Sequence, residues 1–241
     1  MEQTSFHSFY YNRSLNSKHI SLYFSTLYKK EIILLFLPNL KVKLDQLMNY
    51  LAHIYLSKED KELRIGNFIA DSVKGKDFSS FPDRIAQGII LHREIDTFTD
   101  THPIVRQSKD LIREKFGHWS GVIVDIYYDH FLAANWSDFH EAPLEDYVQG
   151  FYKDLNNAHS VLPKRVQKFL PFMIEQNWLY HYATVEGISI IFEQMNHRTK
   201  GKSSMNLAPI DLVNYYKELE QHFRLFFEDL KLYVEQRTLE L

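Results

Sequence analysis

Several polar side chains in this chain recur four residues apart inside otherwise apolar segments. A four-residue interval stacks two side chains on one face of an α-helix, so each set would present its groups together. Imidazoles and carboxylates arranged in this way are suited to binding a cation or moving a proton. The sets are Asn49 with His53, Asn67 with Asp71, His92 with Asp96 and Asp100, and Asp125 with Asp129, which His130 follows directly.

The residues around these sets are strongly apolar. One apolar run, 89–91, precedes His92, and another, 122–124, precedes Asp125. A buried carboxylate is costly without a partner, and a cluster of carboxylates and imidazoles needs a cation at its centre. Helical bundles bind metals through side chains that project inward from facing helices. Mixed imidazole and carboxylate ligands favour Mn²⁺, Mg²⁺ or Fe²⁺, which polarise a phosphoryl oxygen and activate water. We therefore expect a divalent metal site.

Each set also has a purely structural interpretation. His53 could be a hydrogen-bonded histidine of the core, and Asp71 could cap the end of a helix. Asp129 could orient the ring of His130 instead of binding metal. Because four segments carry such sets, a shared functional site is the stronger hypothesis. The alternative is a non-catalytic helical binding protein, whose polar pairs would form buried networks and bind no metal.

The segments that carry these residues are predicted to be helical. From position 48 onward apolar residues recur with helical spacing, and Pro, Gly or Asn/Ser clusters bound each stretch. The whole chain has only 8 Gly and 7 Pro in 241 residues, which favours long helices. The expected helices span 49–56, 62–73, 82–97, 103–116, 121–136, 144–157, 164–177, 184–195 and 210–232. The predicted fold class is all-α, a single helical bundle over residues 48–241.

Residues 1–47 differ from the rest of the chain. Their seven-residue apolar run, 32–38, is too short to span a bilayer and is not followed by a signal-peptide cleavage site. We expect an N-terminal extension without a catalytic role, mis-started or poorly ordered.

The composition excludes several classes of protein. The chain has no cysteine, which excludes disulfides, thiolate catalysis and cysteine-bound zinc, and fits a reducing cytoplasm. The formal net charge of −3 gives no overall attraction to nucleic acid or membrane. We therefore expect a cytoplasmic protein with neither of these as a partner. Attraction to an acidic partner would need a local basic patch.

Taken together, the motifs resemble the acyl carrier protein phosphodiesterase family, a divergent branch of the HD-type phosphohydrolases. The similarity includes Met-Asn-Tyr-Leu-Ala-His at 48–53 and Gly-Asn-Phe-Ile-Ala-Asp at 66–71. It continues with His-Arg-x-Ile-Asp-x-x-Thr-Asp at 92–100 and Asp-His-Phe-Leu at 129–132, and it covers residues 48–240. The combination of the last two motifs is specific, although neither would be alone. The acidic–imidazole pair at 129–130 reverses the usual HD order.

The resemblance implies hydrolysis of the phosphodiester that joins 4′-phosphopantetheine to a serine of holo acyl carrier protein. It also implies an HD-like helical fold and a divalent metal, Mn²⁺ by preference. A competing function with the same fold and site is hydrolysis of a nucleotide or another small phosphoester. The expected metal ligands are His92, Asp96, Asp129, His130, His53 and Asp71. The expected catalytic residues are Asp125 and Asp129, as proton acceptors, and Arg93, which would neutralise phosphate oxygens.

Basic residues are candidates for binding the acidic carrier protein. A late basic loop contains Arg198, Lys200 and Lys202, and Asn67 is a further candidate for substrate binding. Lys74, Lys76 and Arg84 also lie close to the predicted site in sequence. Complementary charge would steer the encounter between the two proteins and make it sensitive to salt.

Overall fold

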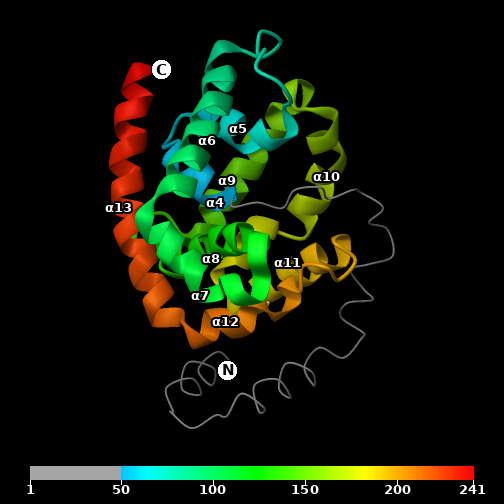
Figure 1. Ribbon diagram of the computed structural model, residues 1–241. Helices are drawn as coiled ribbons and strands as arrows, with labels where there is room; N and C mark the ends of the chain where they lie inside the picture. Colours follow the sequence, from blue (N-terminus) through cyan, green and yellow to red (C-terminus); the bar gives the residue numbers. More distant parts are fainter. Residues whose placement is uncertain (1–49) are drawn as a thin grey trace. The chain divides into compact units, whose positions relative to one another are not determined.

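The computed structural model of the protein describes residues 50–241, and all regular structure in this part is helical (Figure 1). The expected all-α class is therefore confirmed for these residues, among which there is no strand. The HD-like arrangement of the helices stays a prediction. The expected N-terminal extension, 1–47, lies outside the described residues, as do Met48 and Asn49.

The first described helices follow one another closely in the sequence. They are α4 (Tyr50–Leu56), α5 (Lys61–Ile69), the short 3₁₀ turn η1 (Ala70–Ser72) and α6 (Asp83–Thr101). Asp60 begins α5, because its carboxylate accepts a hydrogen bond from the backbone N–H of Leu63 at 3.0 Å. The same carboxylate binds Arg84 of α6 at 2.7 Å and so ties the starts of α5 and α6 together.

α5 and α6 cross unusually closely, because both helices carry a glycine at the crossing. A Cβ atom added to Gly66 would overlap the carbonyl oxygen of Ile85 and lie 2.9 Å from the Cα of Gly88. Gly88 is equally crowded by the backbone of α5. The missing side chains thus allow backbone-to-backbone contact. Asn67 directly follows Gly66, and His92 lies one turn after Gly88, so this crossing brings the two together.

The remaining helices complete the core. They are α7 (Pro103–Phe116), α8 (Ser120–Ala134), α9 (Leu144–Asn157), α10 (Lys164–Glu175), α11 (Val185–Arg198), α12 (Ala208–Asn214) and α13 (Tyr216–Glu240). α8 packs against α4, α7, α11 and α13 and is buried on nearly all sides, with Ile123, Val124 and Phe131 fully inaccessible. The long α13 runs along one side of the described bundle and contacts α6, α7 and α8 (Figure 1).

Several helix boundaries differ from those expected, and two of the differences change how neighbouring helices are connected. α6 continues beyond the predicted end at 97 to Thr101, where His102 begins α7 by accepting a hydrogen bond from Ile104 N–H. The helix predicted over 210–232 is divided at Tyr215, whose N–H closes α12 on the carbonyl of Asp211. The break lets both α12 and α13 bury their apolar faces. Helix propensity alone does not predict it, because it depends on how the two helices pack against the rest of the protein.

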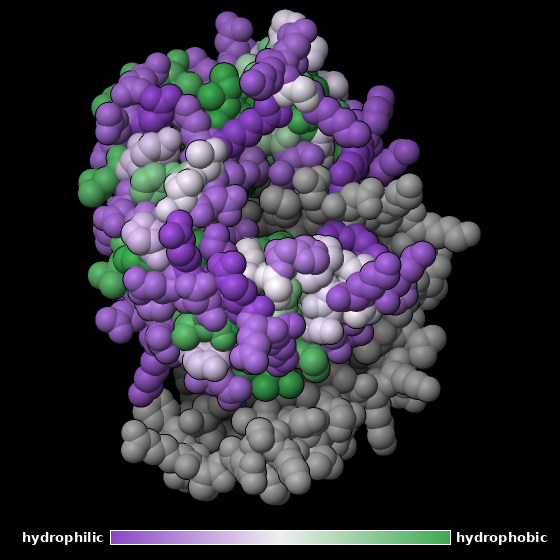
Figure 2. All heavy atoms as spheres, viewed as in Figure 1, coloured by the Kyte–Doolittle hydropathy of each residue, from purple (hydrophilic) through white to green (hydrophobic). Residues whose placement is uncertain are grey.

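The visible surface of the described residues is mostly hydrophilic, with scattered hydrophobic side chains (Figure 2). Among residues 50–241, no helix combines the length and the apolar character that a membrane span requires.

Candidate metal centre

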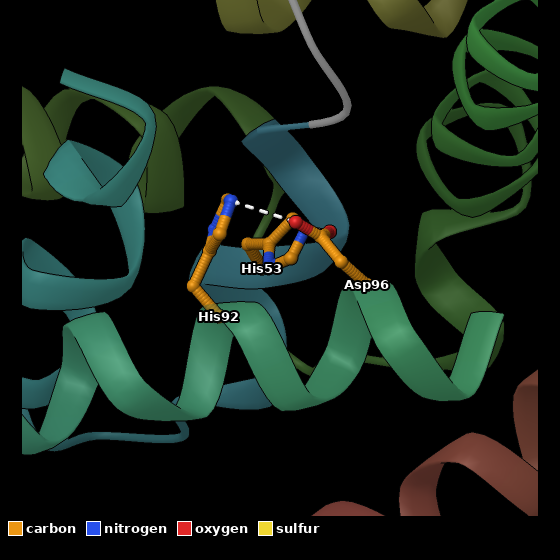
Figure 3. A group of neighbouring side chains, drawn as sticks. All are labelled: His53, His92 and Asp96. Atoms are coloured by element: carbon orange, nitrogen blue, oxygen red, sulfur yellow. Dashed lines mark ion pairs between the residues drawn. The ribbon is translucent and has the colours of Figure 1, made fainter. Parts of the chain in front are cut away.

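Four polar side chains from α4, η1 and α6 meet in a largely buried site, and together they are called the metal group below. His53 comes from α4, Asp71 from η1, and His92 and Asp96 from successive turns of α6. Figure 3 shows His53, His92 and Asp96 pointing toward one another. The Nε2 atoms of His53 and His92 lie 3.3 Å and 3.2 Å from the two carboxylate oxygens of Asp96. Asp71 Oδ1 lies 3.4 Å from Nε2 of His92, and the two imidazole rings stack with centroids 4.0 Å apart.

Asn67 fixes the tautomer of both imidazoles through contacts with their Nδ1 atoms, on the side away from the centre of the site. Its amide nitrogen donates to the carbonyl of His53 at 2.9 Å and to Oγ of Ser57 at 3.0 Å, which fixes the orientation of the amide. Its oxygen then faces Nδ1 of His53 at 2.7 Å and Nδ1 of His92 at 3.2 Å. An amide oxygen can only accept, so the network assigns a proton to Nδ1 of each ring. Both Nε2 atoms are left with lone pairs toward the centre of the site.

The centre of the site therefore contains acceptors that face acceptors. The atoms His53 Nε2, His92 Nε2 and Asp71 Oδ2 are buried and make no hydrogen bond with any residue of 50–241. Two imidazole lone pairs and two carboxylates stabilise one another only around a positive charge. Ligand atoms of His53, His92 and Asp96 all lie within 4.8 Å of one another, a spacing that one metal ion can bridge. Nδ1–H bonds to a fixed acceptor are the usual support of metal-binding histidines. This group of residues fits a divalent metal.

The pKa shifts of these side chains also indicate that the site is stabilised by a positive charge. Burial lowers the pKa of His53, and the neighbouring His92 lowers it further. Burial would also lower the pKa of His92, but the carboxylates of Asp71 and Asp96, 3.4 Å and 3.2 Å from its Nε2, raise it to about 9. The two histidines hold the pKa of Asp96 well below its usual range, although burial opposes this. Without metal, one extra proton on His92 provides the positive charge that the carboxylates require.

The site opens to solvent on the Asp96 side. The Asp96 side chain is 37% exposed and that of Asp71 is 12% exposed, whereas both histidine side chains are almost completely covered. A substrate can therefore reach the carboxylate side of the group while the imidazoles remain rigidly packed.

Comparison with known proteins connects this geometry to a family. A family model described as acyl carrier protein phosphodiesterase matches residues 48–230, which include every member of the group. The chain belongs to this family. A relative named acyl carrier protein phosphodiesterase from Pectobacterium atrosepticum is 28% identical over 181 residues, or 75% of this chain and 94% of the relative. One of the same name from Escherichia coli (strain SMS-3-5) is 28% identical over 193 residues, or 80% of this chain and all of the relative. No solved structure shows a significant match.

In this family member, the structure does not bring Asp129 and His130 into the group, although both were expected as ligands. Both Asp129 oxygens accept backbone N–H bonds at the start of α4, from Leu51 at 3.0 Å and Ala52 at 2.8 Å. Burial raises the pKa of Asp129 to about 7, although these bonds oppose the shift. His130 contacts the carbonyl of Tyr182 through Nδ1 at 2.8 Å, and burial lowers its pKa to about 4. This geometry favours structural roles for both residues.

Asp125, expected as a proton acceptor, lies one turn before Asp129 on α8. It is partly buried and lines a cavity of about 20 Å³, which suffices for about one water molecule. Ala52 and Ile95, the sequence neighbours of His53 and Asp96, line the same cavity. Burial raises the pKa of Asp125 well above its usual range, and the charge of Asp96 adds to the shift. Asp125 therefore keeps its proton to a higher pH than an ordinary carboxyl group, and it senses the charge of Asp96.

Arg93 points away from the metal group, although it follows His92 directly. Its guanidinium donates to the carbonyls of Gly75 and Val73, and it lies over the ring of Phe78. The expected contact of Arg93 with phosphate is not supported by this geometry. In an α-helix, neighbouring side chains are rotated by about 100°, which separates Arg93 from His92.

The expected substrate-binding residues lie in two places. Asn67 is completely buried, and its amide oxygen and nitrogen are both engaged behind the histidines, so it does not face a substrate. Arg198 ends α11, and Lys200 and Lys202 are exposed in the loop that follows. Two features that position the metal ligands were not predicted from the sequence. These are Ser57, which orients Asn67, and the Gly66–Gly88 crossing, for which two glycines inside helical patterns were the available signal.

Proposed function

We propose that this chain is a metal-dependent phosphodiesterase that removes 4′-phosphopantetheine from holo acyl carrier protein in the cytoplasm. The observation that supports it most is the pair of imidazole Nε2 atoms, held in their metal-binding form by Asn67 and facing Asp96 and Asp71. The names of the relatives supply the substrate class, because they are acyl carrier protein phosphodiesterases. Neither nucleic acid nor membrane is proposed as a partner.

The proposed metal ligands are His53, His92, Asp96 and Asp71. Two imidazoles and two carboxylates suit Mn²⁺, which we propose as the ion, and also admit Mg²⁺ or Fe²⁺. A bound divalent ion supplies Lewis acidity, which polarises a phosphoryl oxygen and makes water a stronger nucleophile near neutral pH.

We assign the remaining roles to residues around the group. In its ionised form Asp125 accepts the proton of the attacking water, because a raised pKa makes its carboxylate a stronger base than an ordinary one. Asn67 orients the histidines and does not bind substrate. Asp129 holds the start of α4 and His130 supports the core. Arg198, Lys200 and Lys202 stay candidates for contact with the substrate.

Intact-mass measurement of holo carrier protein tests the proposal directly. After incubation with the enzyme and Mn²⁺, the carrier protein should lose the mass of the prosthetic group and free 4′-phosphopantetheine should appear. Chelation should stop the reaction, and Mn²⁺ should restore it. Release of phosphate from a nucleotide panel, with holo carrier protein untouched, would favour the small-phosphoester alternative. Unchanged activity after complete metal removal would exclude the metal mechanism.

Two variants separate the proposed roles. His92→Ala should lose both bound metal and turnover. Asp125→Asn should keep bound metal and lower kcat by roughly 10²–10⁴, the usual contribution of general acid–base catalysis. Asp110→Asn on the exposed face of α7 is the matched control and should match the wild-type enzyme. Wild-type kcat in Asp125→Asn would remove Asp125 from the mechanism.

A further inference from the structure

The connection between η1 and α6 is an open loop, residues 73–82, at the N-terminal end of α6 (Figure 1). One side chain, Arg93, holds it in shape from α6. Its Nη1 donates to the carbonyl of Gly75 at 2.7 Å and its Nη2 to the carbonyl of Val73 at 3.1 Å. The guanidinium carbon also lies 4.9 Å from the ring centroid of Phe78. A planar fork that binds two carbonyls and stacks on a ring defines the path of the loop.

The first half of this loop presents two lysines to solvent. Gly75 has a φ of +80°, a conformation that favours glycine, and Lys74 and Lys76 flank it. Both lysines are exposed, and neither forms an ion pair within the described part of the chain. Asp77 directs a carboxylate oxygen to the N–H of Ser79, at 3.0 Å, and so supports the loop itself. Arg84, by contrast, is already paired with Asp60.

The first half of the loop is connected to the metal group in two ways. Asp71 precedes Lys74 by three residues, so their Cα atoms are separated by at most about 11 Å. In addition, Arg93, the residue after His92, binds the carbonyls of Val73 and Gly75. The backbone that carries the two lysines is therefore held close to the centre that would cleave the substrate.

We propose that the Lys74–Lys76 loop is the docking surface for an acidic face of the carrier protein. This inference rests on the proposed function. The scissile phosphodiester is attached directly to a serine, so the surface of the carrier protein must approach within a few ångströms of the metal group. A loop that begins two residues after Asp71 then meets that surface. Unpaired lysines there attract carboxylates and exclude basic partners.

Charge reversal of the loop tests the docking surface. The double variant Lys74→Glu/Lys76→Glu should raise KM for holo carrier protein about tenfold or more, with kcat changed by less than about twofold. Its efficiency toward carrier protein should also fall about tenfold relative to that toward bis(p-nitrophenyl) phosphate. The salt dependence of kcat/KM should become flatter. The control Lys153→Glu/Lys217→Glu reverses two exposed lysines on α9 and α13 and should behave as the wild type.

Arg93 gives a second, independent variant. Arg93→Lys keeps the charge but cannot hold two carbonyls in a planar fork. As a positioning residue for the loop, it should raise KM for carrier protein while the affinity for Mn²⁺ stays at the wild-type value. A kcat loss with unchanged KM would instead assign Arg93 to the chemistry and overturn its place in the docking surface.

Direct binding separates the failure of this inference from that of the proposed function. The affinity for fluorescently labelled apo carrier protein is measured by anisotropy and needs no turnover. Weaker binding to the loop variant than to the control supports the docking surface even if the wild-type enzyme does not hydrolyse holo carrier protein. Equal binding by the loop variant and the control, or no binding by the wild type, overturns it.

Discussion

Replacing Asn67 by Ala tests whether this buried amide prepares the metal site. The change removes four hydrogen bonds, two from the imidazoles and two to His53 O and Ser57. Each buried donor left without a partner costs about 1–3 kcal/mol, so the metal-free protein should lose roughly 2–5 kcal/mol of unfolding free energy. Without a fixed acceptor the rings can also rotate and change tautomer. Loss of such support lowers metal affinity by about 10–100-fold, or roughly 1.4–2.8 kcal/mol.

Two measurements separate the effects of Asn67→Ala. Urea unfolding of metal-free protein gives the change in stability, and calorimetric titration with Mn²⁺ gives the change in affinity of the folded protein. Asn67→Asp retains an acceptor for both Nδ1–H groups and should keep more metal affinity than Asn67→Ala. Asn156→Ala, on the exposed side of α9, is the matched control. Wild-type Mn²⁺ affinity in folded Asn67→Ala would refute the assignment of the imidazole tautomers by this amide.

Three further predictions concern the crossing, the metal and pH. Gly66→Ala should lower the unfolding free energy by about 3 kcal/mol or more, since its Cβ meets backbone, whereas Gly150→Ala in open space on α9 should gain about 0.5–1 kcal/mol. Mn²⁺ at 100 times its Kd should stabilise the wild type by about 2.7 kcal/mol, or roughly 5–10 °C in Tm, and Asp96→Asn much less, which differential scanning fluorimetry measures. The pKa of His130 in the folded protein, about 4, lies below its value in the unfolded chain. Between these two pKa values the unfolded chain binds more protons than the folded protein, so the unfolding free energy falls as the pH drops through this range. Urea unfolding should show the wild type losing about 2 kcal/mol more than His130→Asn between pH 7 and pH 5.

The helical class and the central pair of the site could be predicted from sequence. His92 and Asp96 lie four residues apart on one predicted helix, and the structure confirms that they face the same point. The convergence of His53 and Asp71 with them followed from a weaker argument, that buried polar groups need partners. That argument identifies which residues must be paired, but it does not identify their partners.

The roles of Arg93, Asp129 and Asn67 could not be predicted in the same way, because they depend on how the helices cross. Arg93 follows a ligand in sequence, yet the helical rotation of about 100° directs it to another surface. The same rotation keeps Asp129 and His130 from facing one point. The role of Asn67 required knowledge that Gly66 and Gly88 meet where α5 crosses α6. A glycine inside a helical pattern signals a close contact, but it does not identify the helix that makes the contact.

Three sets of contacts position the metal site, and each sets a different part of its geometry. Asp129 fixes the start of α4 through two N–H bonds, the Gly66–Gly88 crossing sets the separation of α5 and α6, and Asn67 sets the rotation of both imidazoles. Asn67 can accept hydrogen bonds from both rings only when the other two sets of contacts have placed α4 and α6 at the correct distance. Its contribution should therefore depend on theirs. In a double-mutant cycle of Asp129→Asn with Asn67→Ala, the losses of Mn²⁺ affinity should sum to more than the loss in the double variant. Additive losses would mean that the cap on α4 acts on stability alone and not on the geometry of the metal site.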